Sequence, residues 1–239
     1  MSNSNKDKYS NLMHKQGEAG GQVPPQFCRH DIDFNKTSSR KFAEYVAGRY
    51  TTQKISELEE LVNYLHNHGR QFLKSVVEIG TFKGGTLWMF SQLAAEGATI
   101  VSIDLPGGDF GGGSTEIELG WIKDSLRKDQ KSHFIRKSSQ ELSTKDELVD
   151  ILGNQKIDLL FIDGDHSYEG VQKDTRVATS KVKNGGVLVF NDYMPWSIFE
   201  FQPYGVMATA NQLINKGWSL EGLALQPYGY FDVALRSPN

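Results

Sequence analysis

Short apolar runs alternate with longer amphipathic segments over most of the chain. Five apolar runs occupy residues 75–80, 99–104, 133–138, 158–163 and 186–192. Their continuous hydrophobic character is typical of parallel strands that are buried on both faces. Four intervening segments occupy residues 84–96, 116–131, 143–154 and 168–183. Each is long enough for a crossover helix, so the alternation predicts a doubly wound, Rossmann-like α/β sheet with helices on both faces.

The two ends of the chain add further elements to this pattern. Apolar residues recur three and four positions apart in residues 40–50 and 55–68, which predicts two helices before the sheet. Residues 218–225 and 230–236 are expected to pair as antiparallel strands at one edge, which completes a seven-stranded, mostly parallel sheet. The first 35 residues are polar and glycine-rich. We therefore expect residues 1–50 to form a partly irregular N-terminal arm or cap, and residues 51–239 to form the α/β domain.

Composition narrows the classes of partner. The chain has 239 residues, of which 38% are hydrophobic and 23% charged, with a formal net charge of -3. This balance lacks the basic footprint of a nucleic-acid-binding protein. No apolar run approaches the ~18 residues that a membrane helix requires, and the polar first residues contain no apolar signal core. We expect a cytoplasmic protein that acts on a small-molecule substrate, without nucleic acid or membrane as a partner.

A glycine-containing turn links the first predicted strand to its helix. The sequence VVEIGTFKGGT supplies Glu78, Gly80, Thr81, Gly84, Gly85 and Thr86. The spacing E-x-G-x-x-x-G differs from the G-x-G-x-x-G of dinucleotide-binding folds, so the turn suits a ligand without a phosphate group. The second strand ends at Asp104, where a carboxylate can accept hydrogen bonds from ribose hydroxyls. An incidental glycine pair with a capping aspartate is the alternative interpretation.

A second cluster of polar residues follows the fourth and fifth predicted strands. Asp163 ends one strand in the sequence FIDGDHSYEG, and Asn191 and Asp192 end the next in GGVLVFNDY. Their oxygen atoms should converge at one edge of the sheet, where hard donors favour Mg²⁺ or another divalent cation. His166 lies three residues beyond Asp163 and is the candidate general base, since an unperturbed histidine pKa of about 6.5 permits proton removal near neutral pH. Alternatively, these acids cap a loop and His166 begins a helix.

The motifs VEIGTFKGGT, SIDLPGG, FIDGDHSYEG and GGVLVFNDY resemble class I S-adenosylmethionine-dependent methyltransferases. More narrowly, they resemble the family 24-like group, which contains cephalosporin-hydroxylase-like proteins and macrolide-sugar O-methyltransferases. It implies that S-adenosylmethionine is the cofactor and that residues 51–239 form a class I methyltransferase domain. The implied cofactor contacts are Glu78, Gly80, Thr81, Gly84, Gly85 and Thr86 around the methionine part, Asp104 at the ribose, Ser138, Ser139 and Gln140 near the adenine, and Asp163.

The same resemblance implies that Asp163 ligates magnesium and that His166 is the base. At the fifth strand the macrolide-sugar enzymes have two acidic residues, whereas this chain has Asn191 followed by Asp192. A catechol-type methyltransferase uses one aspartate and one asparagine in the opposite order. We therefore expect a metal site formed by Asp163, Asn191 and Asp192, with weaker affinity than an all-carboxylate site.

These features predict an O-methyltransferase, dependent on Mg²⁺, that methylates a hydroxyl of a sugar, polyketide or other natural product. The alternatives are a hydroxylase or nucleotide-sugar-modifying enzyme, and a non-catalytic cofactor-binding partner. The glycine-rich residues 104–113 are a candidate lid, and the aromatic residues 193–205 a candidate substrate wall. The N-terminal arm and the aromatic stretch are candidate contacts in a homo-oligomer.

Overall fold

A seven-stranded sheet forms the centre of the computed structural model, which describes residues 37–48, 51, 53–67, 72–107, 113–197, 202–225 and 231–239. The strands lie in the order β3-β2-β1-β4-β5-β9-β8. Their bounds are β1 Ser75–Ile79, β2 Thr99–Asp104, β3 Lys131–Arg136, β4 Ile157–Ile162, β5 Val182–Phe190, β8 Ser219–Leu225 and β9 Phe231–Arg236. The first five are parallel, and β9 is antiparallel to both neighbours. The predicted doubly wound sheet is confirmed.

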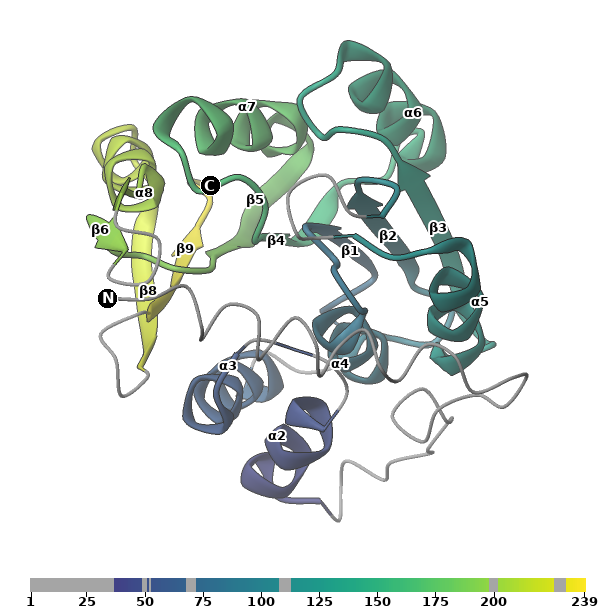
Figure 1. Cartoon of the computed structure of the whole chain (residues 1–239). Helices are drawn as coiled ribbons and strands as arrows, with labels where there is room; N and C mark the ends of the chain where they lie inside the picture. Colours follow the sequence, from purple (N-terminus) through teal and green to yellow (C-terminus); the bar gives the residue numbers. More distant parts are fainter. Residues whose placement is uncertain are drawn as a thin grey trace, which may run out of the picture.

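Helices cover both faces of this sheet, as Figure 1 shows. One face carries α2 Ser39–Ala47, α3 Ile55–Asn67, α4 Gly85–Leu93 and α5 Glu116–Ser125. The other carries α6 Leu142–Leu152, α7 Tyr168–Ala178 and α8 Val206–Asn215. Alternate side chains of each central strand point to opposite faces, so the sheet contributes to two hydrophobic clusters. Val77 and Ile79 lie in the cluster with α6 to α8, whereas Val76 lies in the other.

Several element boundaries differ from the sequence prediction. β3 begins and ends two residues earlier than residues 133–138, because Lys131 and Ser132 belong to an edge strand whose exposed positions carry no apolar signal. β5 begins at Val182, four residues before the predicted start, because the polar residues Lys183 and Asn184 interrupt the apolar run. The predicted helix 168–183 therefore ends at Ala178 and is followed by a short 3₁₀ turn, Thr179–Lys181. The predicted helices 84–96 and 116–131 end at Leu93 and Ser125.

The C-terminal strands pair as predicted, and they join the sheet through β9 against β5. The helix α8, which connects this region to the rest of the fold, was not predicted, although its buried side Val206, Thr209, Ala210 and Leu213 has helical spacing. A two-residue strand pair, β6 Trp196–Ser197 and β7 Gln202–Pro203, lies outside the main sheet. This segment carries part of the candidate substrate wall.

The helix α2 packs into the core of the α/β domain. Phe42, Ala43 and Val46 are buried on one side of α2, and the ring centroids of Phe42 and Trp88 lie 5.6 Å apart. Residues 39–47 therefore share a hydrophobic cluster with α3 and α4. The rest of the predicted arm, residues 1–36, lies outside the described part of the chain, and the boundary at residue 50 stays a prediction. Among the described residues no helix has the length and apolar character to cross a membrane.

Candidate active site

The turn between β1 and α4 brings its glycines against other parts of the protein. Gly80 and Gly84 have φ values of 86° and 82°, in the left-handed region that favours glycine. A Cβ atom on Gly80 would lie 1.9 Å from the carbonyl oxygen of Asp163, and one on Gly84 would lie 2.9 Å from the side chain of Ile122. The glycines are thus required by contacts within the fold, and the turn after β1 packs directly on the loop after β4.

Glu78 is buried near the carboxyl end of β1. Its side chain is fully buried, and neither carboxylate oxygen has a hydrogen-bond partner among the described residues. Burial raises the pKa of Glu78 to about 8, opposed by the nearby hydroxyls of Thr86 and Thr81, while the charges of Asp163 and Asp104 raise it further. A buried carboxylate without a donor is costly, so this position suits a ligand that brings an ammonium group or another strong donor.

Asp104 at the end of β2 is held by the backbone of the neighbouring turns. Its Oδ2 accepts a hydrogen bond from the Phe82 amide at 2.6 Å, and its Oδ1 accepts one from the Leu105 amide at 2.8 Å. Phe82 has a φ of 49°, which is unusual for a residue with a bulky side chain. Burial raises the pKa of Asp104, although these backbone donors oppose the rise. Each oxygen keeps a further lone pair, and the predicted ribose contact is compatible with this arrangement.

The two threonines of the predicted cofactor site are buried beside the same turn. The hydroxyl oxygens of Thr81 and Ser102 lie 2.7 Å apart, which joins the turn to β2. Gly85 and Thr86 form the first turn of α4, where backbone amides point out of the helix N-terminus. The structure therefore places the predicted methionine-site residues of this turn together at the carboxyl edge of the sheet.

The predicted adenine residues follow β3 at the start of α6. The hydroxyl of Ser139 donates to Asp174 Oδ1 at 2.6 Å, and the Ser138 carbonyl accepts from the hydroxyl of Thr144. Gln140 Nε2 donates to Asp165 Oδ2 at 3.2 Å. These contacts connect the β3 loop to α7 and to the loop after β4. The adenine role of Ser138, Ser139 and Gln140 stays a prediction.

The second predicted cluster converges at the carboxyl ends of β4 and β5. The Nε2 atom of His166 lies 3.3 Å from Asp163 Oδ1 and 3.8 Å from Asp192 Oδ2. Asp192 has a φ of 55°, which is uncommon for a residue other than glycine and often marks a functional position. All three side chains are about one-fifth exposed or less, so they are shielded but accessible to a ligand.

Asn191 joins this cluster through its amide nitrogen. Its Nδ2 donates to Asp163 Oδ1 at 2.9 Å, while its Oδ1 accepts a hydrogen bond from Gln53 Nε2 at 3.3 Å. Gln53 was not predicted as a site residue, because it lies 138 positions away in a segment without a motif. The oxygen of Asn191 therefore points away from Asp163 in this arrangement.

The predicted metal ligands fit a divalent cation in chemistry and only partly in orientation. Asp163 and Asp192 supply two carboxylates, and each has an oxygen within 3.8 Å of His166 Nε2. No three His, Cys, Asp or Glu side chains form a metal-binding group in the described ranges, so a site here depends on the Asn191 oxygen. That oxygen is one amide rotation away from the cluster. The metal role of these residues stays a prediction.

Contacts with four further residues fix the loop that carries His166. The ring of Tyr204 packs on the imidazole with centroids 4.6 Å apart, and the Gly205 amide donates to the His166 carbonyl at 2.7 Å. Asp165 Oδ1 accepts from the Ser167 amide at 2.8 Å, so Asp165 stabilises the turn before α7. Ser167 caps α7 through the Gly170 amide. Tyr204 lies in the predicted aromatic wall, but its contact with His166 has no counterpart in the sequence pattern.

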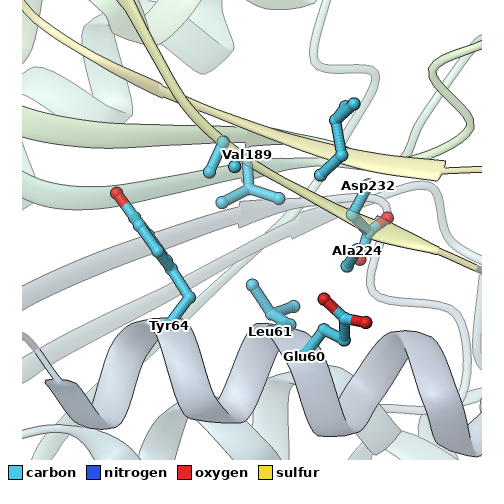
Figure 2. A pocket seen from close by; sticks show the side chains of 9 residues that line it. Glu60, Leu61, Tyr64, Val189, Ala224 and Asp232 are labelled. Carbon is cyan, nitrogen blue, oxygen red and sulfur yellow. The ribbon is translucent and has the colours of Figure 1, made fainter.

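A cavity of about 160 Å³ lies beside this site, between α3 and the strands β5, β8 and β9. Figure 2 shows Glu60 extending from α3 toward the strands that carry Ala224 and Asp232. Asp232 is buried and neither of its carboxylate oxygens has a hydrogen-bond partner among the described residues. Burial and the charges of Glu57, Asp163 and Asp192 raise its pKa well above the ordinary value. The predicted site residues do not line this cavity.

The candidate lid and wall are only partly described. Gly107 donates its amide to the Ser114 carbonyl at 3.2 Å, which closes the base of the loop 104–113, but residues 108–112 lie outside the described chain. In the predicted wall, Met194 and Tyr204 form a small buried cluster, and residues 198–201 lie outside the description. The lid and wall functions stay predictions.

Comparisons with known proteins agree with this architecture. A family model described as "Methyltransferase domain" matches residues 77–193, which contain both predicted clusters. The "Uncharacterized protein R132" of Acanthamoeba polyphaga mimivirus is 32% identical over 171 residues, which cover 72% of this chain and 71% of the viral protein.

Two solved structures share the fold at low sequence identity. The MycE methyltransferase of the mycinamycin biosynthetic pathway, in complex with Mg and SAH, has a TM-score of 0.55 and 16% identity over 85% of this chain. The match spans 55% of MycE, so this chain corresponds to about half of that protein. An O-methyltransferase from Bacillus cereus, in complex with SAH, has a TM-score of 0.53 and 15% identity, over 87% of this chain and 94% of the other. The family match over residues 77–193, the related viral protein and the seven-stranded sheet lead to one conclusion. The chain belongs to the family 24-like group of class I methyltransferases.

Proposed function

We propose that this protein is an S-adenosylmethionine-dependent O-methyltransferase that methylates a hydroxyl group of a small molecule with the help of Mg²⁺. The observation that carries the proposal is the position of His166 Nε2, 3.3 Å from Asp163 and 3.8 Å from Asp192, at the strand ends beside the glycine turn. A histidine between two carboxylates is a suitable acceptor for the proton of an alcohol, because the carboxylates stabilise the imidazolium that forms.

The cofactor half of the site supports S-adenosylmethionine. Its ammonium group would give a strong donor to the Glu78 carboxylate, which has no hydrogen-bond partner in the described part of the chain, and Asp104 would accept from the ribose. The bound cofactor supplies a sulfonium methyl group as the electrophile. The protein positions the cofactor relative to the base. Gly80 contacts the Asp163 backbone, so the turn that would bind the cofactor and the loop that carries His166 are packed together.

The metal half of the site rests on Asp163, Asp192 and Asn191. A bound Mg²⁺ would lower the pKa of a substrate hydroxyl, as metal ions lower the pKa of coordinated water. His166 would accept the proton of the hydroxyl, and Tyr204 packs on its imidazole ring. The hydroxyl-bearing small molecule is inferred from the base and the acidic cluster.

Cofactor binding is tested first by calorimetry with S-adenosylmethionine and its demethylated product. We expect binding that weakens in Glu78→Ala, while absence of binding to the intact chain would refute the proposal. Methyl-labelled cofactor should then transfer label to members of a panel of sugars and polyketides. Label that appears only on amines or on RNA would refute O-methylation of a small molecule.

The metal role is tested separately. Activity should fall after EDTA treatment and return with Mg²⁺. Unchanged activity after EDTA would remove the metal from the proposal and leave methyl transfer intact.

A further inference from the structure

Gln53 contacts the candidate metal site from the segment before α3. Its side chain is buried, and its Nε2 donates to Asn191 Oδ1 at 3.3 Å. Asn191 in turn donates its Nδ2 to Asp163 Oδ1 at 2.9 Å. This chain of two hydrogen bonds directs the Asn191 hydrogens toward the acidic cluster. Without a cation this direction is favourable, because an amide oxygen facing the Asp163 carboxylate would be repelled.

The other end of the Gln53 amide is unsatisfied. Gln53 Oε1 is buried and has no hydrogen-bond partner among the described residues. Leaving a buried polar atom unpaired costs about 1–3 kcal/mol. If both amides rotated, Gln53 Oε1 would accept from Asn191 Nδ2, and Asn191 Oδ1 would turn toward Asp163. The Gln53 nitrogen would then take the place of the unpaired oxygen, so each arrangement pairs one of the two Gln53 amide atoms with Asn191. The terminal torsions of Asn and Gln are broad and roughly two-fold, so this exchange needs no change of backbone.

We propose that Gln53 is a positioning residue that allows Asn191 to exchange its two amide ends when a divalent cation binds between Asp163 and Asp192. The inference rests on the proposed function, since it concerns the cation of the same site. One hydrogen bond joins the two amides before and after the exchange, so a nearby positive charge decides which end of Asn191 faces the cluster. Glutamine is suited to this role because its amide both donates and accepts.

The exchange explains how an asparagine serves where two adjacent acids would be expected. Without a cation, Asn191 acts as a donor that relieves the crowding of negative charge, to which Glu78 and Asp232 also belong through their interactions with Asp163. With a cation, the same side chain becomes an oxygen ligand. Asparagine therefore binds a cation more weakly than aspartate would, and it keeps a hydrogen bond to Gln53 with and without the cation.

The direct test follows the side-chain NH₂ signals of Gln53 and Asn191 by ¹H–¹⁵N NMR during a titration with MgCl₂. The signals are assigned from their disappearance in Gln53→Met and Asn191→Asp. In the unmodified chain we expect both NH₂ groups to shift with the same dissociation constant as the backbone amides of Asp163 and Asp192. If the backbone amides shift and the Gln53 NH₂ does not, the inference is overturned while the metal role survives.

Asn191→Asp is a matched control for the exchange. A carboxylate presents oxygen on both sides, so Gln53 can keep donating to residue 191 whether or not a cation is bound. We expect this variant to bind Mg²⁺ more tightly and its Gln53 NH₂ signal to stay in place. A Gln53 signal that moves equally in both proteins would contradict the exchange.

Gln53→Glu tests the amide exchange through the affinity of the site for Mg²⁺. A carboxylate at residue 53 only accepts, so it holds Asn191 Nδ2 and leaves the Asn191 oxygen toward the cluster. We expect about tenfold tighter Mg²⁺ binding by calorimetry at pH 8, where an ionised acceptor forms a stronger hydrogen bond. Gln53→Glu in an Asn191→Ala background keeps the added charge without the amide. A gain of equal size in both backgrounds would show a pure charge effect and overturn the inference.

A complete absence of Mg²⁺ binding to the intact chain overturns this inference and the metal role together. Cofactor binding and methyl transfer by EDTA-treated protein would then be unaffected, which separates that result from a failure of the proposed methyltransferase function. Thermal unfolding of each variant, compared with the intact chain, identifies a loss of folding before binding is interpreted.

Discussion

The imidazole of His166 packs on the phenol ring of Tyr204, with ring centroids 4.6 Å apart and an interplanar angle of 35°. Tyr204 is buried, and its neighbour Gly205 donates its amide to the His166 carbonyl. A Cβ atom on Gly205 would lie 2.1 Å from the backbone of Tyr168. The segment after β7 therefore packs tightly against the loop that carries His166.

Removing the Tyr204 ring should release the His166 side chain. We expect Tyr204→Ala to lower kcat about tenfold or more with little change in the affinity for the cofactor, because a misplaced base loses much of its effect. Tyr204→Phe keeps the aromatic contact and should retain most of the activity. Steady-state kinetics and calorimetry check both variants. An equal loss of kcat in Tyr204→Phe and Tyr204→Ala would show that ring packing is not the cause.

His166→Ala should remove the proton acceptor. We expect kcat to fall roughly 10²–10⁴-fold, the range that general base catalysis contributes, while the dissociation constant of S-adenosylhomocysteine stays within a factor of about two. His133→Ala, on the edge strand β3, is the matched control. A His166→Ala enzyme with unchanged turnover would assign the base elsewhere.

Cofactor binding should release a proton from Glu78. Its pKa of about 8 leaves most of the carboxyl protonated at pH 7 in the free protein, and an ammonium partner would lower that pKa. We expect close to one proton released per bound cofactor at pH 7. Calorimetry in two buffers of different ionisation enthalpy measures this release, which should vanish in Glu78→Gln. A binding enthalpy that is independent of buffer would contradict the contact.

The same carboxyl should make the ligand-free protein less stable at high pH. A pKa raised by folding from 4.5 to about 8 means that the folded state binds the proton more tightly than the unfolded state. Its contribution to stability is full below about pH 4.5 and is lost as the pH rises toward 8. Urea unfolding between pH 5 and 9 should show this decline, reduced in Glu78→Gln and not abolished, because Asp174 and Asp232 also have raised pKa values. An unaltered slope in Glu78→Gln would contradict the assignment.

Gly80→Ala should be strongly destabilising. The added Cβ would lie 1.9 Å from the Asp163 carbonyl oxygen. Gly97 also has a positive φ of 70°, but a Cβ added there would meet no non-neighbouring atom of the described residues within 4 Å. Gly97→Ala should cost about 1–2 kcal/mol for the left-handed backbone alone. We expect Gly80→Ala to cost at least about 2 kcal/mol more, or to prevent folding. Similar losses of unfolding free energy in the two variants would show that the close approach to Asp163 relaxes easily.

The sheet was predictable because buried parallel strands appear as continuous apolar runs. β2 was predicted to its exact residues, since Ile100, Val101 and Ile103 are flanked by polar positions. β3 and β5 were misplaced at their starts, because exposed or irregular strand positions there carry lysine, serine and asparagine. α8 was missed because it follows an aromatic, proline-containing stretch that resembles a loop.

The candidate site was predictable only where a motif lies at a strand end. Asp104, Asp163 and Asp192 follow apolar runs, so their common edge follows from the parallel order of the strands. The contacts of Gln53 and Tyr204 were not predictable, because they join segments with no shared pattern.

By itself, the sequence determined the order of the five parallel strands and their crossover helices, the family, and which polar residues lie at the carboxyl edge of the sheet. These features depend on local periodicity and on residues adjacent in the chain. Only the tertiary structure decided that the Glu78 carboxylate has no hydrogen-bond partner among the described residues and that Gly80 is required by the Asp163 backbone. It also decided that Asn191 turns its nitrogen toward Asp163 while its oxygen accepts from Gln53. Burial, close approach and amide orientation depend on what distant segments place around a residue, and no local pattern encodes them.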